Sequence, residues 1–378
     1  MPSTELRQNI LTTSRRVVVK IGTQLLTTTE PGIDLDFIES LADQIASLIK
    51  RGCEVTLVSS GAVGAGCVEL GLPKRPTDVA DLQAAAAIGQ RRLMRHFYEA
   101  FKKHNIPVAQ VLLTRTDFDD RNRYLNIRNC IRRLHAFKTL PILNENDTVS
   151  VDELRFGDND MLAALTANAL RAQALILLTT VDGLLDSEGN IIDLVDNVSN
   201  FLNLTTGENG TAIGKKSSWG AGGMGSKLSA AELVTGAGDI AVIANGRHDD
   251  ILPRLLAGEK LGTVLLPAKR KLDSRKRWIA LTKRPAGTIT IDDGAVRALK
   301  QNGKSLLASG ITHVKGTFKQ GDILTIQDSD GNEIARGLTN YPASELKLIQ
   351  GKRSTEFEAI LGQFAYAEVI HRDHLVIS

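Results

Sequence analysis

The sequence predicts an α/β protein with a mainly parallel sheet, followed by a second, smaller β domain. Apolar, β-branched runs alternate with amphipathic helical segments over residues 15–266, which is typical of βαβ units. From about residue 285, short strands punctuated by glycine replace this pattern and indicate a small β-barrel. The 378 residues also exceed the usual single domain of about 100 to 200 residues, so we expect two domains.

The first βαβ unit consists of a strand over 15–23, a helix over 36–50 and a strand over 54–58. Lys20 closes the first strand, and its ammonium should emerge at the carboxyl end of the sheet, toward either an anion or solvent. The second strand leads into a loop of small residues, 59–66. Ser60 and Gly61 in this loop would let backbone N–H groups approach an anion, while its later glycines could instead serve helix packing.

A cluster of acid and amide side chains comes next along the chain. A helix over 81–104 and a strand over 106–113 precede a charged stretch, 114–133, which suggests a solvated helix face, a mobile lid or a subunit contact. The buried strand 140–143 then ends in four polar residues, 144–147. Such a switch marks the edge where open α/β sheets bind ligands.

A second polar cluster, 157–160, precedes a helix in which Asp158 or Asn159 would be the cap. Both clusters could be ordinary capping turns, since Asn, Asp and Gly are common in loops. The alternative is a binding site at one edge of the sheet.

A glycine-rich segment, 219–227, opens a helix expected over 228–236, after the strand 174–180. Its GxGxxG is not a dinucleotide fingerprint, because a polar loop precedes it and no acidic residue follows at about 20 residues. A glycine loop at a helix start, with Lys227 just inside, is instead a cradle for phosphate. Strands over 239–244 and 262–266 complete the first domain.

We place the domain boundary in a basic connector, residues 269–283, between a first domain over 1–268 and a second over 284–378. The net charge is only +3, which argues against a general nucleic-acid-binding surface. No apolar run would span a bilayer and no signal peptide is evident, so we expect a cytoplasmic protein. The three cysteines and seven histidines show no zinc spacing, and no metal site is predicted.

This inventory suits phosphoryl transfer. Two lysines, a glycine cradle and two acid/amide clusters are expected at one sheet edge, whereas no activated Ser or Cys nucleophile can be named. Transfer from a nucleotide requires positive charge on the phosphoryl oxygens and a positioned acceptor rather than a protein nucleophile.

The first domain resembles the glutamate 5-kinase family of the amino-acid kinase superfamily, and the second resembles a PUA domain. The resemblance to the kinase rests on residues 17–23, 59–62, 112–115, 142–147, 157–160 and 222–227, in that order. The resemblance to the PUA domain rests on residues 293–295, 304–307, 321–322 and 335–338. The resemblance to the kinase implies a three-layer sandwich fold. It also implies that ATP phosphorylates the glutamate γ-carboxylate to γ-glutamyl phosphate, the first step of proline biosynthesis.

The resemblance also implies roles for individual residues. Lys20 and Lys227 would hold the ATP phosphates, and Asp160 would orient both lysines. The glutamate-binding residues would be Ser60, Asn144, Asp147, Asp158 and Asn159. The nucleotide pocket would be formed by Lys20, Thr179, Thr180, Ala221, Gly222, Gly223, Met224, Gly225, Ser226 and Lys227, with Mg²⁺ held mainly through the nucleotide phosphates. Many members have Asp at the position of Thr180 and Thr at that of Ala221.

Family resemblance further implies a homo-oligomer and feedback inhibition by proline, acting through residues 114–130. Two alternatives stay open at this point. The acceptor could be acetylglutamate, aspartate or a nucleoside monophosphate, or the protein could bind RNA through its PUA-like domain. RNA binding is the weaker alternative, because residues 284–378 contain equal numbers of basic and acidic residues.

Overall fold

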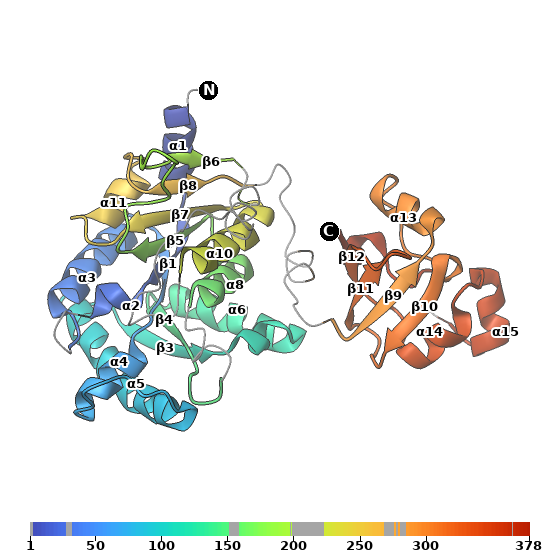
Figure 1. Ribbon diagram of the computed structural model, residues 1–378, viewed down its shortest axis with the longest axis horizontal. Helices are drawn as coiled ribbons and strands as arrows, with labels where there is room; N and C mark the ends of the chain where they lie inside the picture. The colour runs from blue at the N-terminus through green and yellow to red at the C-terminus, as the bar shows by residue number, and fades with distance from the viewer. Residues whose placement is uncertain are drawn as a thin grey trace. The chain divides into compact units, whose positions relative to one another are not determined.

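The computed structural model describes residues 3–27, 32–150, 159–196, 198, 223–267, 276, 279, 285–364 and 366–378. The chain forms two compact units, Met1–Lys271 and Leu272–Ser378, which we describe separately (Figure 1). Most of the predicted basic connector, 269–283, lies outside the described residues.

The first unit is built on an eight-stranded sheet with the order β3-β4-β2-β1-β5-β7-β8-β6. The pairs are parallel except for β7 with β8, which is antiparallel. The mainly parallel sheet is therefore confirmed. The strands are β1 (Arg16–Ile21), β2 (Glu54–Val58), β3 (Val108–Leu113), β4 (Leu140–Glu145), β5 (Ala174–Thr179), β6 (Leu194–Val195), β7 (Ile240–Asn245) and β8 (Thr263–Leu265).

Helices cover both faces of this sheet, which makes three layers (Figure 1). One face carries α3 (Leu35–Lys50) and α5 (Val79–Lys102), with α11 (Ile251–Leu256) packed on α3. The other carries α6 (Arg121–Ala136), α8 (Asp160–Leu170) and α10 (Met224–Gly236). The shorter elements are α1 (Ser3–Thr12), α2 (Thr23–Leu26), α4 (Ala62–Glu69) and η1 (Arg115–Phe118).

Strand β1 shows how the alternation of side chains positions Lys20. Val17, Val19 and Ile21 belong to the core that β1 shares with α3 and α5. Because successive side chains of a strand point to opposite faces, Lys20 lies on the face covered by α8. The interpretation of Lys20 as a surface lysine is wrong, since only 2% of it is exposed.

The predicted loop 59–66 is wrong from Ala62 onward, where α4 begins. A Cβ on Gly66 would lie 1.8 Å from the carbonyl oxygen of Ala85, and one on Gly89 would lie 1.9 Å from that of Ala62. These glycines therefore allow the backbones of α4 and α5 to touch. Packing explains Gly66, whereas Gly61 at φ +96° precedes the helix as its N-cap.

The second unit contains a five-stranded sheet with the order β10-β9-β11-β12-β13 and its own apolar core. The strands are β9 (Gly287–Ile291), β10 (Ile311–Gly316), β11 (Ile323–Gln327), β12 (Glu333–Leu338) and β13 (Leu375–Ile377). The expectation that helices fade after residue 285 is incomplete, because helical segments pack on this sheet. They are α13 (Asp293–Lys300), η2 (Ala308–Gly310), α14 (Ala343–Ile349), η3 (Ser354–Glu356), α15 (Phe357–Leu361) and η4 (Arg372–His374).

Helix α1 was not predicted, because its sequence is polar. It is held by Arg7, whose fully buried guanidinium donates to Asp193 Oδ1 and to the backbone carbonyls of Asp193, Glu259 and Leu261. Within the described ranges, no helix is long and apolar enough to cross a membrane. A cytoplasmic location stays a prediction from the sequence.

Candidate active site

Two lysines from distant segments meet on one carboxylate. Lys20 Nζ lies 2.6 Å from Asp160 Oδ1, and Lys227 Nζ lies 3.1 Å from Asp160 Oδ2. Asp160 is fully buried, and Lys20 and Lys227 are 2% and 6% exposed. Buried charges must be paired, and here two cations share one anion. Two ammonium groups held this close together suit the binding of a phosphate.

The helix starts reinforce this positive character. Asp160 is the first residue of α8, and Lys227 lies in the first turn of α10, which packs on α8. Both N-termini therefore add positive dipole ends near the lysines. Helix α10 begins at Met224, four residues earlier than predicted, with Gly223 as N-cap.

Of the predicted nucleotide-binding loop, Gly223, Met224, Gly225, Ser226 and Lys227 are described. Ser226 Oγ donates to Asp160 Oδ2 over 3.1 Å, so its hydroxyl belongs to the same group as the lysines. Ala221 and Gly222 lie outside the described residues.

The predicted amide residues form a second, adjoining group. Asn159 Nδ2 donates to the backbone oxygen of Ser59 (2.6 Å), to Ser60 Oγ (3.1 Å) and to Asn144 Oδ1 (2.8 Å). Strand β4 ends beside β2, where Ser59 N–H donates to Leu143 O. The structure thus brings together Ser60, Asn144 and Asn159. Asn159 directly precedes Asp160 in the chain.

Asn159 is the N-cap residue of α8, one of the two caps that the sequence predicted. Its side chain makes no capping bond, because its amide donates into the cluster. The predicted end of the strand at residue 143 is wrong. Strand β4 continues through Asn144 and Glu145, both of which are buried. Asp158 lies outside the described residues.

Thr179 and Thr180 lie where β5 ends beside β1. Thr179 is the last residue of β5, and Gly22 N–H donates to Leu178 O, which joins the two strand ends. Thr180 Oγ1 donates to Gln24 Oε1 over 2.9 Å. Both threonines therefore lie at the edge of the sheet that carries Lys20.

Asp147 follows β4 in a turn and lines a cavity of about 470 Å³ next to the amide group. α5 and β3 supply the other walls of this cavity. Its lining includes Gln90, a residue that the sequence did not single out, although its side chain bonds to Asn144. A glutamine in an amphipathic helix carries no signal that would distinguish it from a surface residue.

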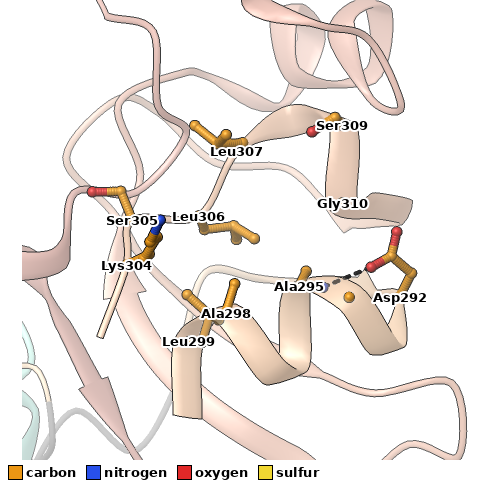
Figure 2. A pocket seen from close by; sticks show the side chains of 11 residues that line it. Asp292, Ala295, Ala298, Leu299, Lys304, Ser305, Leu306, Leu307, Ser309 and Gly310 are labelled. Carbon is orange, nitrogen blue, oxygen red and sulfur yellow. Dashed lines mark hydrogen bonds between the residues drawn. The ribbon is translucent and has the colours of Figure 1, made fainter. Parts of the chain in front are cut away.

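The second unit has a cavity of about 270 Å³ between α13 and residues 304–310 (Figure 2). Asp292 Oδ1 caps α13 by accepting from Ala295 N–H over 2.7 Å, so this carboxylate is already engaged. Among the described residues lining the cavity, Lys304 supplies the cation, and Ala298, Leu299 and Leu306 supply apolar surface. One ammonium is a weak attractor for a polyanion.

Comparisons with known proteins agree with this architecture. Residues 15–245 match the amino acid kinase family, and residues 287–361 match the PUA domain. A carbamate kinase from Giardia lamblia, solved with AMP-PNP, superposes with a TM-score of 0.50 at 18% identity, covering 68% of this chain and 100% of that one. The family matches and the fold thus define an amino acid kinase with a C-terminal PUA domain.

Curated relatives narrow the class further. A glutamate 5-kinase from Geobacter sp. (strain M21) is 46% identical over 98% of this chain and 100% of its own length. One from Chromohalobacter salexigens is also 46% identical, over 98% of both chains. The chain belongs to the glutamate 5-kinase family.

Proposed function

We propose that Lys20, Asp160 and Lys227 form the phosphoryl-transfer centre of a glutamate 5-kinase. Family membership assigns the reaction: ATP phosphorylates the γ-carboxylate of glutamate to γ-glutamyl phosphate, the first step of proline biosynthesis. The observation that carries the residue assignment is the pair of buried ammonium groups on one carboxylate.

The chemistry needs no general base from the protein, because the acceptor carboxylate is already ionised at neutral pH. A γ-carboxylate oxygen forms a bond to the γ-phosphorus of ATP, the bond from that phosphorus to the bridging oxygen breaks, and ADP leaves. The main barrier is the approach of two anions. Lys20 and Lys227 lower it by neutralising charge on the phosphoryl oxygens, and Asp160 holds both ammonium groups in place.

ATP fits this site because two ammonium groups and the N-termini of α8 and α10 meet there, and both attract phosphate oxygens. Bound Mg²⁺ would neutralise further charge on the phosphates. Among the described residues, no group of three or more His, Cys, Asp or Glu side chains could hold a metal ion. We propose that the ion is held mainly through the nucleotide phosphates, with Thr179, Thr180 and residues 221–227 around the nucleotide.

Glutamate would bind at the adjoining amide group, formed by Ser60, Asn144 and Asn159, with Asp147 and Asp158 as further contacts. Because the Asn159 nitrogen is engaged with three acceptors, its carbonyl oxygen branches away from them and can accept from the substrate ammonium. Because Asn159 directly precedes Asp160, an acceptor bound at Asn159 would lie beside the lysines.

The test is an assay with ATP, Mg²⁺ and glutamate in the presence of hydroxylamine, which traps an acyl phosphate as its hydroxamate. Lys227→Ala should lower kcat by about 10²-fold or more, because it removes charge stabilisation of the transferred group. Lys103→Ala, which removes an exposed lysine paired with Glu39, is the matched control and should retain activity. A folded Lys227→Ala variant with near-normal turnover would refute the assignment. Acetylglutamate, aspartate and nucleoside monophosphates test the other acceptors.

Proline inhibition and a homo-oligomer are further proposals. Residues 114–130 start directly after β3, whose Leu113 O accepts from Asn146 N–H beside the glutamate cluster. A ligand-dependent shift of this segment would therefore be felt by the acceptor site. We expect proline to raise the KM for glutamate more than that for ATP, and sedimentation should reveal more than one subunit.

RNA binding is disfavoured, and salt-dependent retention of residues 268–378 on RNA would reverse this view.

A further inference from the structure

The amide group has a fourth member, which lies on helix α5 rather than at a strand end. Gln90 Oε1 accepts a hydrogen bond from Asn144 Nδ2 over 2.7 Å. Asn144 Oδ1 accepts from Asn159 Nδ2 over 2.8 Å and from the backbone N–H of Glu145 over 2.9 Å. Since Asn144 is only 2% exposed, water cannot easily replace any of these partners.

The polarity of this chain of amides leaves Asn144 a single orientation. Its oxygen must face the two donors, Asn159 Nδ2 and Glu145 N–H. Its nitrogen then points to α5 and requires an acceptor there, which Gln90 provides. Without that acceptor a buried N–H group would lose its hydrogen bond, and Asn144 would rotate or shift to recover one.

The packing of α5 fixes where Gln90 can reach. Its neighbour Gly89 is in backbone contact with α4, since a Cβ there would lie 1.9 Å from Ala62 O. Helix α4 starts directly after Ser60 and Gly61. The same contact between helices therefore positions both ends of the group, Ser60 on one side and Gln90 on the other.

We infer that Gln90 is a positioning residue for the acceptor side of the site. It holds Asn144, and through Asn144 the amide of Asn159, in the orientation in which glutamate is bound. The inference rests on the proposed function, because it assumes that this group receives glutamate. The hydrogen bond of Gln90 goes to Asn144 in the amide group, so we expect the nucleotide side not to depend on it.

Gln90→Met, which keeps the length of the side chain but removes the acceptor, should raise the KM for glutamate about 10-fold, the effect of losing one hydrogen bond to a buried group. The KM for ATP should stay near that of the wild type. The matched control is Gln110→Met. Gln110 lines the same cavity and makes no hydrogen bond to the amide group in the described structure, so its KM for glutamate should not change. A purely structural role for Gln90 would instead lower kcat, change both KM values and reduce Tm together.

A double-mutant cycle tests whether Gln90 acts through Asn144. In the Asn144→Ala background, Gln90→Met should have almost no additional effect on the KM for glutamate. Equal effects in both backgrounds, or an unchanged KM in the single variant, would overturn the inference. If Gln90→Met fails to fold, Gln90→Asn keeps the amide but is too short to reach, and it should give the same selective rise. Wild-type hydroxamate formation reports separately on the proposed function.

Discussion

Asp160 is the residue on which both lysines depend, because each of its oxygens is engaged by a different ammonium group. Asp160→Asn would remove the carboxylate that two buried ammonium groups share. We expect the free energy of unfolding to fall by about 3 kcal/mol, as for other broken buried ion pairs, and kcat to fall by about 10²-fold. Urea unfolding and the hydroxamate assay measure the two effects.

Ser226→Ala provides the matched comparison for Asp160→Asn. It removes the hydrogen bond that the uncharged Ser226 hydroxyl donates to Asp160 Oδ2 and leaves every charged side chain in place. Its effect on kcat should be at most about 10-fold. Equal losses in the two variants would show that charge is not what Asp160 contributes.

His135 makes the stability depend on pH. Its Nε2 lies 2.9 Å from Thr56 Oγ1. Burial lowers the pKa of His135, and Arg16 lowers it further, whereas Glu54 raises it. Because the folded pKa is below the unfolded value of about 6.5, the unfolded chain takes up the proton first as the pH falls. The free energy of unfolding should therefore be full above about pH 6.5 and decrease below it.

Urea unfolding at two pH values, above and below the unfolded histidine pKa, tests this for His135→Gln, which can still bond to Thr56. This variant should lose less stability on acidification than the wild type. His313→Gln, at an exposed position, should behave like the wild type. Part of the pH dependence of stability should persist in His135→Gln, because burial and the neighbouring Arg92 and Arg95 also lower the pKa of His96. An unaltered slope in His135→Gln would contradict the assignment.

At the scale of elements, the contact between α4 and α5 should tolerate no side chain at Gly66. Gly66→Ala would place a Cβ 1.8 Å from Ala85 O, so the helices must separate, at a cost of about 1 to 3 kcal/mol. Gly64→Ala, on the same helix, meets nothing closer than Thr27 Cγ2 at 3.8 Å and should stabilise the protein by up to about 1 kcal/mol. Denaturant unfolding of both variants checks the opposite signs, and equal signs would contradict the packing argument.

The helices and strands also show how much of the fold the sequence could predict. Strand β2 was predicted to the residue, because β-branched and apolar residues fill Val55–Val58, all of them buried. Strand β4 was predicted two residues too short, because Asn144 and Glu145 are polar yet buried, and only tertiary partners make that burial possible. Helix α4 was missed because glycine and alanine at a helix contact look like a loop.

The candidate site also contains residues that the sequence could predict and one that it could not. Motif resemblance proposed Lys20, Asp160 and Lys227 and the pairing of both lysines with Asp160, and the packing of α8 against α10 explains how that pairing arises. Gln90 could not be proposed, because its partner is 54 residues away and nothing local marks it.

At the scale of the whole molecule, the described residues of the site lie between Lys20 and Lys227, within the unit Met1–Lys271. Each unit has its own apolar core, and the two cores share no residue. A chain ending at Lys271 should therefore unfold cooperatively and keep glutamate- and ATP-dependent hydroxamate formation, with a KM for glutamate near that of the full chain. Circular dichroism in urea and the hydroxamate assay on both chains provide the comparison. A truncated chain that unfolds cooperatively but has lost the activity would mean that the PUA unit completes the site, and the assignment of catalysis to the first unit alone would be wrong.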